Sequence, residues 1–201
     1  MLGPFEKTAS EAYRALFFNI DALIRKMKEL VPDGNLNILE LGCGEGMFVM
    51  HLLEAYPHAQ ITGVDINDRI GRVCKGCPAR VVFKKETVKA LAAESAGIFD
   101  LITVIDVLHH VPEDLQPEFL SEAKKALKPG GTIVIKEWTR NRLPVHLLVH
   151  LLDRFVTGDR VSYRSADSLR GLTKDLFGGD SIKYETSIGP WPNNRAFFIK
   201  P

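Results

Sequence analysis

Short apolar runs alternate with longer amphipathic stretches through the middle of this chain. The predicted strands are residues 36–41, 60–65, 80–84, 99–105 and 132–136. The stretches long enough for helices that cross between parallel strands are residues 47–56, 68–75, 87–96 and 113–127. Strands that alternate with helices form βαβ units. This order therefore predicts an α/β fold with a doubly wound, mostly parallel sheet and helices on both faces.

Both ends of the chain depart from this rhythm. Two further predicted strands, 181–187 and 196–200, lie too close together for a crossover helix, so we expect them to pair antiparallel. They bring the predicted sheet to seven strands with the last one reversed. At the start, residues 8–11 match a capping box and apolar residues follow at helical spacing as far as Leu30, which predicts an amphipathic helix.

Composition limits the kind of protein and its partners. With 201 residues, 45% hydrophobic and 25% charged, the chain can form one packed core and is not typical of disordered or fibrous proteins. The 26 Lys and Arg residues nearly balance the 25 Asp and Glu residues, so the net charge of +1 gives no overall reason to bind nucleic acid or an anionic membrane.

Location is predicted from what the sequence lacks. No apolar run reaches about 18 residues and the first residues do not resemble a signal peptide, so we expect neither membrane insertion nor export. The three cysteines are too few for a disulfide framework, which favours a reducing compartment. We therefore expect a cytoplasmic protein.

The most informative motif is a strand that runs into three alternate glycines and then a helix, Ile38-Leu39-Glu40-Leu41-Gly42-Cys43-Gly44-Glu45-Gly46-Met47-Phe48. Glycine lets the chain turn sharply and brings backbone amides close to a ligand. The third glycine comes one residue earlier than in the dinucleotide fingerprint, and no Lys-Ser or Lys-Thr follows as in a P-loop. Asp65 ends the next strand, where a carboxylate can accept hydrogen bonds from both ribose hydroxyls. The motif predicts a cofactor site that is not built for NAD.

Together with two further blocks, this motif resembles the class I S-adenosylmethionine-dependent methyltransferases. Residues 40–46 resemble the first motif of that family, and Val64-Asp65 resembles the second. Residues 99–111 resemble its fourth-strand motif, and residues 127–132 resemble the turn before its fifth strand. The resemblance, closest to the small type-11-like members, implies a Rossmann-like methyltransferase fold. It also implies S-adenosylmethionine as cofactor and S-adenosylhomocysteine as product.

On this resemblance we expect a single methyltransferase domain over residues 1–201. Its expected parts are an N-terminal helical cap at 1–34, a cofactor-binding core at 35–137, a helical acceptor-side insertion at 138–180 and closing antiparallel strands at 181–201.

The resemblance also implies which residues hold the cofactor. The glycines of the turn would lie against it, with Glu40 near its methionine amino group and Asp65 on its ribose. Asp106, just after the fourth predicted strand, would lie beside the methionine part and the methyl group. The glycines concerned are Gly42, Gly44 and Gly46.

The expected adenine contacts depart from the family pattern. The family often has an Asp after the third strand, whereas this chain has Lys84-Lys85-Glu86-Thr87 there. Glu86 is a candidate acceptor for the adenine amino group, although the dipole of a following helix explains a carboxylate at this position equally well. Ile66 is placed to pack on the adenine face, although an apolar residue after a strand is ordinarily part of the core.

Methyl transfer needs few catalytic groups because a sulfonium methyl is already activated by its positive charge. His109 and His110 follow the fourth predicted strand, at the edge where doubly wound sheets bind ligands, and either could take a proton from a hydroxyl or amine acceptor. The alternative is that the pair only shapes the pocket.

Acceptor specificity is expected in the insertion after the fifth strand. The candidate acceptor-binding residues are Trp138, Arg160, Tyr163 and Arg164. If the acceptor is anionic, the arginines could bind its carboxylate or phosphate with two hydrogen bonds each. Solvated helix faces have the same composition, so an ordinary charged surface is the alternative.

No metal site is predicted. His146 and His150 could share a helix face, but the sequence lacks the Glu that a zinc protease has between them. Cys74 and Cys77 have zinc or redox spacing without a second pair, and we interpret them as incidental, with reversible oxidation as the alternative.

The sequence thus predicts methyl transfer by in-line displacement to an oxygen or nitrogen of a small-molecule acceptor. One alternative is an RNA or protein methyltransferase that uses the arginine-rich insertion for recognition. Another is a catalytically inactive cofactor-binding or scaffold protein. We expect no membrane partner and no nucleic acid partner, and nothing in the sequence indicates the oligomeric state.

Overall fold

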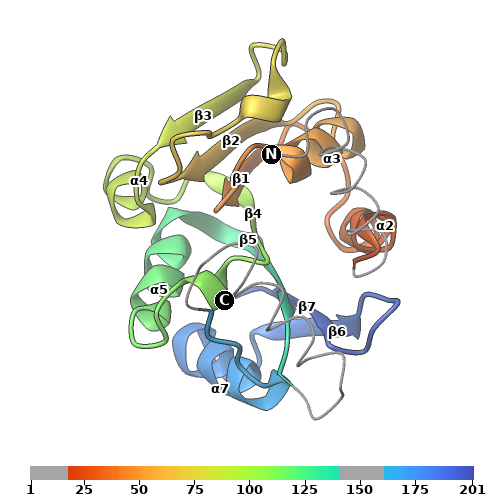
Figure 1. Ribbon diagram of the computed structural model, residues 1–201, viewed down its shortest axis with the longest axis vertical. Coiled ribbons are helices and arrows are strands. Elements are labelled where there is room, and N and C mark those ends of the chain that lie inside the picture. Colours follow the sequence, from red (N-terminus) through yellow and green to blue (C-terminus); the bar gives the residue numbers. More distant parts are fainter. Residues whose placement is uncertain (1–17, 141–160) are drawn as a thin grey trace.

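The computed structural model describes residues 18–140 and 161–201, which form a twisted sheet between two layers of helices (Figure 1). The strands are β1 (Asn37–Leu41), β2 (Gln60–Asp65), β3 (Val81–Lys85), β4 (Phe99–Ile105), β5 (Leu127–Trp138), β6 (Ile182–Ser187) and β7 (Asn194–Ile199). Their order is β3-β2-β1-β4-β5-β7-β6. The first five strands pair parallel, whereas β7 runs antiparallel to both β5 and β6. The predicted sheet of seven strands with a reversed last strand is confirmed.

Three of the described helices begin at side chains that accept hydrogen bonds from free backbone amides. They are α2 (Ile20–Leu30), α3 (Met47–Ala55), α4 (Val88–Glu94), α5 (Gln116–Ala126) and α7 (Ala166–Phe177), with short 3₁₀ turns η1 (Arg72–Cys74) and η2 (Leu108–His110). Asn19, Thr87 and Ser165 cap α2, α4 and α7. None of the helices in the described ranges is long and apolar enough to span a membrane.

Two apolar cores flank the sheet. On one face, Leu23 of α2 and Leu52 of α3 pack with Ile38 of β1. On the other face, Leu120 of α5 and Leu169 of α7 belong to the same core as Leu39. Successive residues of a strand point to opposite faces, so β1 contributes to both cores. Figure 1 shows α2 and α3 on one side of the sheet and α4, α5 and α7 on the other.

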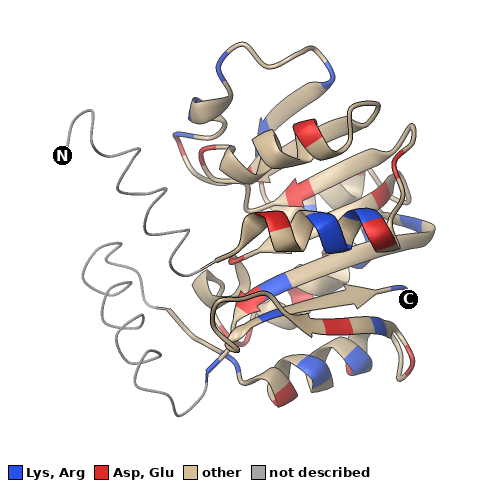
Figure 2. Cartoon of the chain, turned by 90° about the vertical axis from the view of Figure 1, so that its right-hand side faces the viewer, with Lys and Arg blue, Asp and Glu red and all other residues tan. Residues whose placement is uncertain are grey.

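Acidic and basic residues are mixed over the surface. Figure 2 shows Lys and Arg interspersed with Asp and Glu along α2 and along the strands and helix below it. Ion pairs such as Lys26 with Glu29 and Lys89 with Glu118 join the two kinds of charge. The described part of this side therefore presents no continuous basic surface.

One predicted helix is wrong. Residues 68–75 hold only the 3₁₀ turn η1, because Gly71 has a positive φ of 66° that an α-helix does not contain. Backbone hydrogen bonds from Gly71 to Gly44 O (3.1 Å) and from Val73 to Glu45 O (2.9 Å) hold the segment against the glycine turn instead.

The region predicted as an acceptor-side insertion has two parts. Residues 141–160 lie outside the described residues. The described helix α7 packs its buried residues Leu169, Thr173 and Phe177 toward the sheet and contacts α5. It is therefore a crossover helix of the core, and the expected acceptor-side role of residues 138–180 stays a prediction.

Candidate functional site

The three glycines form a left-handed turn between β1 and α3. Gly42, Gly44 and Gly46 have φ values of 70°, 51° and 93°, which side chains with a Cβ rarely adopt. The amides of Gly42 and Cys43 donate to Val64 O at 2.8 and 3.1 Å, which ties the turn to the end of β2. A Cβ on Gly42 would lie 2.5 Å from the Val107 side chain, whereas one on Gly44 would meet nothing within 4 Å. The turn is packed on one side and open in front of Gly44.

Asp65 ends β2 beside this open space. Its Oδ2 accepts the Gly44 amide at 2.7 Å, and its Oδ1 accepts the Asn67 amide at 2.8 Å. Each carboxylate oxygen has a second lone pair, so both can accept one further donor. The next side chain, Ile66, is 72% exposed although it is large and apolar. A charged acceptor and an exposed apolar surface thus lie side by side at the carboxyl edge of the sheet, as a nucleoside requires.

Glu86 follows β3 and joins this group, because its amide donates to Asp65 O at 3.2 Å. Its Oε1 is buried and accepts no hydrogen bond from the described residues. Lys84 Nζ is 3.4 Å from the same oxygen, which compensates its charge without completing a hydrogen bond. A buried carboxylate oxygen with an unused lone pair is suited to accept a hydrogen bond from a ligand amino group.

Glu40 lies beneath the turn and not in front of it. Its side chain is only 1% exposed and its Oε2 contacts the Thr103 hydroxyl of β4. Burial raises the pKa of Glu40 well above its usual range, with the Thr103 hydrogen bond opposing. The Thr103 hydroxyl has one proton and also reaches Leu39 O at 3.2 Å, so a protonated Glu40 that donates to Thr103 satisfies all three groups. The expected contact of Glu40 with a methionine amino group stays a prediction.

Asp106 follows β4 with a positive φ of 55°, which is rare for a residue with a side chain. Its amide donates to Lys136 O at 2.8 Å, and its Oδ2 accepts from Lys136 Nζ at 2.5 Å. Lys136 is 1% exposed, and its ammonium also lies 4.0 Å from the centre of the Phe18 ring. The buried lysine thus holds the Asp106 carboxylate at the end of β4 beside the glycine turn.

Glu137, the next residue of β5, organises the turn after β4. Its Oε1 accepts the amides of Val107 and Leu108 at 2.8 and 2.7 Å. Its Oε2 lies 2.7 Å from His109 Nδ1. A carboxylate only accepts, so Nδ1 carries the proton and donates to it, which leaves Nε2 of a neutral His109 as an acceptor.

The two histidines have different surroundings. His109 is buried and stacks on the Tyr163 ring at 4.9 Å, whereas His110 is exposed. Their ring centres are 4.2 Å apart. The His109 ring is buried and held by the Glu137 carboxylate, so it is the better candidate for a general base.

Asp106, His109 and Glu137 could in principle hold a metal ion, because their ligand atoms all lie within 4.8 Å of one another. The Lys136 ammonium already compensates Asp106, and Glu137 already accepts three hydrogen bonds. These contacts account for the cluster as a hydrogen-bonded network without an ion.

The predicted acceptor-binding residues are not all brought together. Trp138 and Tyr163 are buried in one small aromatic cluster that also contacts Trp191. Arg164 points elsewhere: it donates to Gln116 Oε1 and to Ser168 Oγ and pairs with Glu113. Arg160 lies outside the described residues.

A small closed cavity lies behind His109, between Glu137, Gln116, Trp138 and Arg164. Its volume of about 10 Å³ suffices for roughly one water molecule. Arg164 thus has structural contacts in this position, and its role in binding an acceptor stays a prediction.

Sequence reasoning missed Glu137 and Lys136 as parts of the site. Both occupy the carboxyl end of a parallel strand, which is the edge where such sheets bind ligands. Their position at the end of a predicted strand could have marked both residues as candidates for the site. The partners of the two side chains, His109 and Asp106, follow a different strand and could not be assigned from spacing.

Comparison with known proteins gives a consistent result. A family model described as a methyltransferase domain matches residues 12–176. A ubiquinone biosynthesis O-methyltransferase of Nitrosospira multiformis is 31% identical over 109 residues, which cover 52% of this chain and 44% of that protein. The chain thus matches less than half the length of this curated relative.

Solved structures agree in fold. The 1,6-didemethyltoxoflavin-N1-methyltransferase of Burkholderia thailandensis, with bound 1,6-didemethyltoxoflavin and S-adenosylhomocysteine, has a TM-score of 0.67 at 15% identity, over 90% of this chain and 76% of that chain. A SAM-dependent methyltransferase from Archaeoglobus fulgidus has a TM-score of 0.66 at 17% identity, over 91% and 95% of the two chains.

Proposed function

Since this chain belongs to the family of methyltransferase domains, we propose that it transfers a methyl group from S-adenosylmethionine to an oxygen or nitrogen of a small-molecule acceptor. The observation that carries this proposal is the Asp65 carboxylate, fixed by the Gly44 and Asn67 amides beside an exposed Ile66. This set matches a nucleoside in charge, hydrogen bonding and apolar surface.

The residues at the carboxyl edge fit S-adenosylmethionine, which when bound supplies a methyl group on a positively charged sulfur. Asp65 would accept hydrogen bonds from the ribose hydroxyls with the two lone pairs that its backbone contacts leave available. Ile66 would cover one face of the adenine, and the buried Oε1 of Glu86 would accept from its amino group. The open space at Gly44 would admit the amino acid part, with Asp106 at its far side.

His109 and Glu137 would deal with the proton of the acceptor. With Nδ1 donating to Glu137, His109 Nε2 can accept a proton from a hydroxyl or an amine while the nucleophile approaches the methyl group. The negative charge of Glu137 then stabilises the imidazolium that forms. Glu137 is a positioning residue in this scheme, because it acts through His109.

The acceptor is proposed to be a small molecule, as the names of the relatives suggest for those proteins. Recognition of an anionic acceptor would fall to the predicted insertion at 138–180, in which Tyr163 stacks on His109 and clusters with Trp138. Exclusion of nucleic acid and a cytoplasmic location stay predictions that rest on composition.

Calorimetry with S-adenosylhomocysteine tests the cofactor site. Asp65→Ala removes two hydrogen bonds from hydroxyls to a charged group, so we expect affinity to fall about 100-fold. Ile66→Ala alters an exposed side chain, should leave the fold intact, and is expected to weaken binding about 3- to 10-fold. Asp68→Ala is the matched control, because this 88% exposed carboxylate pairs with Lys85 away from the turn. Equal affinities for all three variants, or binding of NAD in place of the nucleoside, would contradict the proposal.

The acceptor class is tested with cofactor labelled in its methyl group. We expect label to enter small molecules of a metabolite extract and not RNA or protein fractions. Label in RNA or protein would favour the macromolecular alternative, and binding of the nucleoside without any label transfer would favour an inactive binding protein.

A further inference from the structure

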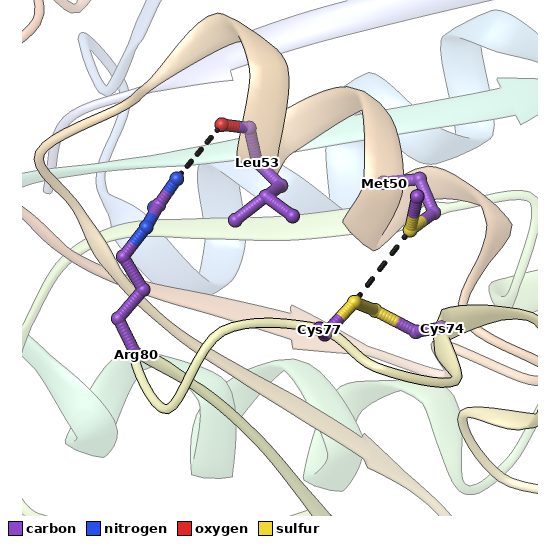
Figure 3. The surroundings of a disulfide bond; sticks show 5 residues. All are labelled: Met50, Leu53, Cys74, Cys77 and Arg80. Atoms are coloured by element: carbon purple, nitrogen blue, oxygen red, sulfur yellow. Dashed lines mark hydrogen bonds between the residues drawn. A yellow bond between two sulfur atoms is a disulfide. The ribbon is translucent and has the colours of Figure 1, made fainter.

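Cys74 and Cys77 form a disulfide in the segment that connects β2 to β3 (Figure 3). Their Cα atoms are 5.4 Å apart, within the usual range for a disulfide. The disulfide agrees with the alternative of reversible oxidation and not with an incidental pair. The third cysteine, Cys43, is a buried thiol in the glycine turn, and burial raises its pKa, so it stays protonated and unreactive.

The disulfide closes a segment that is attached to the cofactor turn. Gly71 and Val73 donate to the carbonyls of Gly44 and Glu45 at 3.1 and 2.9 Å, and Arg72 pairs with the Glu45 carboxylate at 2.8 Å. These contacts come from the residues just before Cys74 and reach the part of the turn that is open to a ligand.

The aromatic ring of Phe83 packs the same segment against the turn. A Cβ on Gly71 would lie 2.7 Å from this ring, and a Cβ on Gly46 would lie 3.1 Å from it. The segment therefore touches the turn with little space to adjust, and a shift of one requires a shift of the other.

On its other side the disulfide lies against α3, the helix that the glycine turn begins. Cys77 Sγ is 3.7 Å from Met50 Sδ, and Arg80 donates to Leu53 O at 3.1 Å (Figure 3). Cys74 itself is buried in the core on this face. Residues 71–80 thus connect the turn and its helix, and the Gly44 amide of that turn donates to Asp65 at the end of β2.

We propose that Cys74 and Cys77 are a reversible thiol–disulfide site that sets the affinity of the cofactor site. This inference rests on the proposed function, because the ligand whose affinity changes is the nucleoside cofactor. With the disulfide closed, the segment holds the turn and the residues after β2 in the arrangement that binds it. With the disulfide open, the loop Lys75-Gly76 is no longer closed. The segment must then become ordered when the cofactor binds, and the free-energy cost of this ordering lowers the affinity.

The exchange needs a low-molecular-weight disulfide of the glutathione class. Cys77 is the more exposed of the two sulfurs, so its thiolate attacks the small disulfide, forms a mixed disulfide and releases one small thiolate. The Cys74 thiolate then attacks the Cys77 sulfur, which forms the protein disulfide and releases the second. Two protein thiols are oxidised, one small disulfide is reduced to two thiols, and the two protons pass to the released thiolates.

The redox state of the cysteines is tested on the full chain, equilibrated in glutathione buffers from reducing to oxidising. Each sample is acid-quenched, denatured and alkylated, and the protein mass is measured by mass spectrometry. We expect three alkylated cysteines in the reduced protein and one, Cys43, in the oxidised protein. Calorimetry with S-adenosylhomocysteine on the same samples should show affinity about 3- to 10-fold weaker in the reduced form. The variant Cys74→Ser/Cys77→Ser should bind like the reduced form and not respond to the buffers.

Hydrogen exchange of the unliganded wild type supplies a second measurement that does not depend on a variant. The Gly44 and Gly71 amides should exchange faster after reduction, while amides of β4 do not change. Equal affinities in both redox states, or three alkylated cysteines in every buffer, would overturn the proposal. If the nucleoside binds in neither state, the proposed function itself fails and this inference falls with it.

Discussion

One carboxylate, Glu137, determines the state of the candidate base. Its three hydrogen bonds fix two amides of the turn after β4 and the tautomer of His109. All three donors come from residues 107–109, so the Glu137 side chain and the turn after β4 fix each other's conformation. A substitution that keeps the shape of Glu137 but changes its hydrogen-bonding groups separates its effect on the turn from its effect on the His109 tautomer.

Glu137→Gln is such a change. The amide oxygen can still accept from Val107 and Leu108, but the amide NH₂ then faces His109 Nδ1 and forces it to be the acceptor. The proton moves to Nε2, so we expect kcat to fall roughly 100-fold or more while the KM for S-adenosylmethionine changes little.

The tautomer is read directly from nitrogen chemical shifts of the His109 ring. His110→Gln is the matched control, because this neighbour is exposed and should leave kcat within a few-fold of wild type. If Glu137→Gln changes the tautomer of His109 but leaves kcat unaltered, His109 is not the general base.

For single residues, the sequence predicts which positions lie at the site better than it predicts their contacts. Asp65 was predicted from its place at the end of a strand, and Ile66 and Glu86 from the family resemblance, and the three lie at one edge because parallel strands end there. Arg164 was predicted to bind an anion, but its partners are Gln116 and Glu113, which follow a different strand. Long-range pairs of this kind depend on how α5 and α7 pack, which spacing along the chain does not encode.

The last helix and the last two strands are held together by another single carboxylate, Glu185 of β6. Arg170 of α7 donates to its two oxygens at 2.9 and 3.0 Å, and Arg195 of β7 donates to one of them. Burial alone would raise the pKa of Glu185, but the hydrogen bonds from Arg170 and Arg195 outweigh it and leave the pKa below its usual range. The three elements therefore share one charged contact.

Glu185→Gln should lower the free energy of unfolding by about 1–2 kcal/mol at pH 7. A carboxylate whose pKa is lower in the folded state stabilises above its unfolded pKa of about 4.3, and this contribution is lost as the pH falls through the folded pKa. We therefore expect wild type and variant to differ fully at pH 7 and to converge as the pH falls below the unfolded pKa and through the folded pKa. Urea unfolding across this range measures the difference.

Glu29→Gln is the comparison for an exposed pair, since Glu29 meets only Lys26 on the surface of α2 among the described contacts. Its effect should stay within about 0.5 kcal/mol at all pH values. If the loss of unfolding free energy in Glu185→Gln does not depend on pH, the contact is stabilised by shape and not by the charge of Glu185.

The elements themselves were largely predictable, and the exceptions have physical causes. Strands such as β2 and β4 match their predicted bounds because apolar runs are bracketed by turn residues. The helix expected at 68–75 fails because its backbone finds partners in the glycine turn, not in its own next turn. β5 is longer than predicted because Leu127 pairs with Phe99 across an irregularity in the ladder.

The sheet joins its two cores into one structure. Ile38 belongs to the core under α2 and α3, and its neighbour Leu39 belongs to the core under α4, α5 and α7. If a strand loses its packing on one core, its packing on the other core is disturbed as well, because successive residues alternate between the two faces of the sheet. Two layers that share their central strands should unfold together.

Leu52→Ala on α3 and Leu120→Ala on α5 are matched changes, since both leucines are fully buried and each faces only one core. Each should lower the free energy of unfolding by about 2–5 kcal/mol. If the layers unfold as one unit, the slowest amides of α3 and α5 exchange through the same global opening, so either variant should accelerate both sets equally. Hydrogen exchange followed by mass spectrometry measures this, and acceleration confined to the face that carries the substitution would show that the two layers open independently.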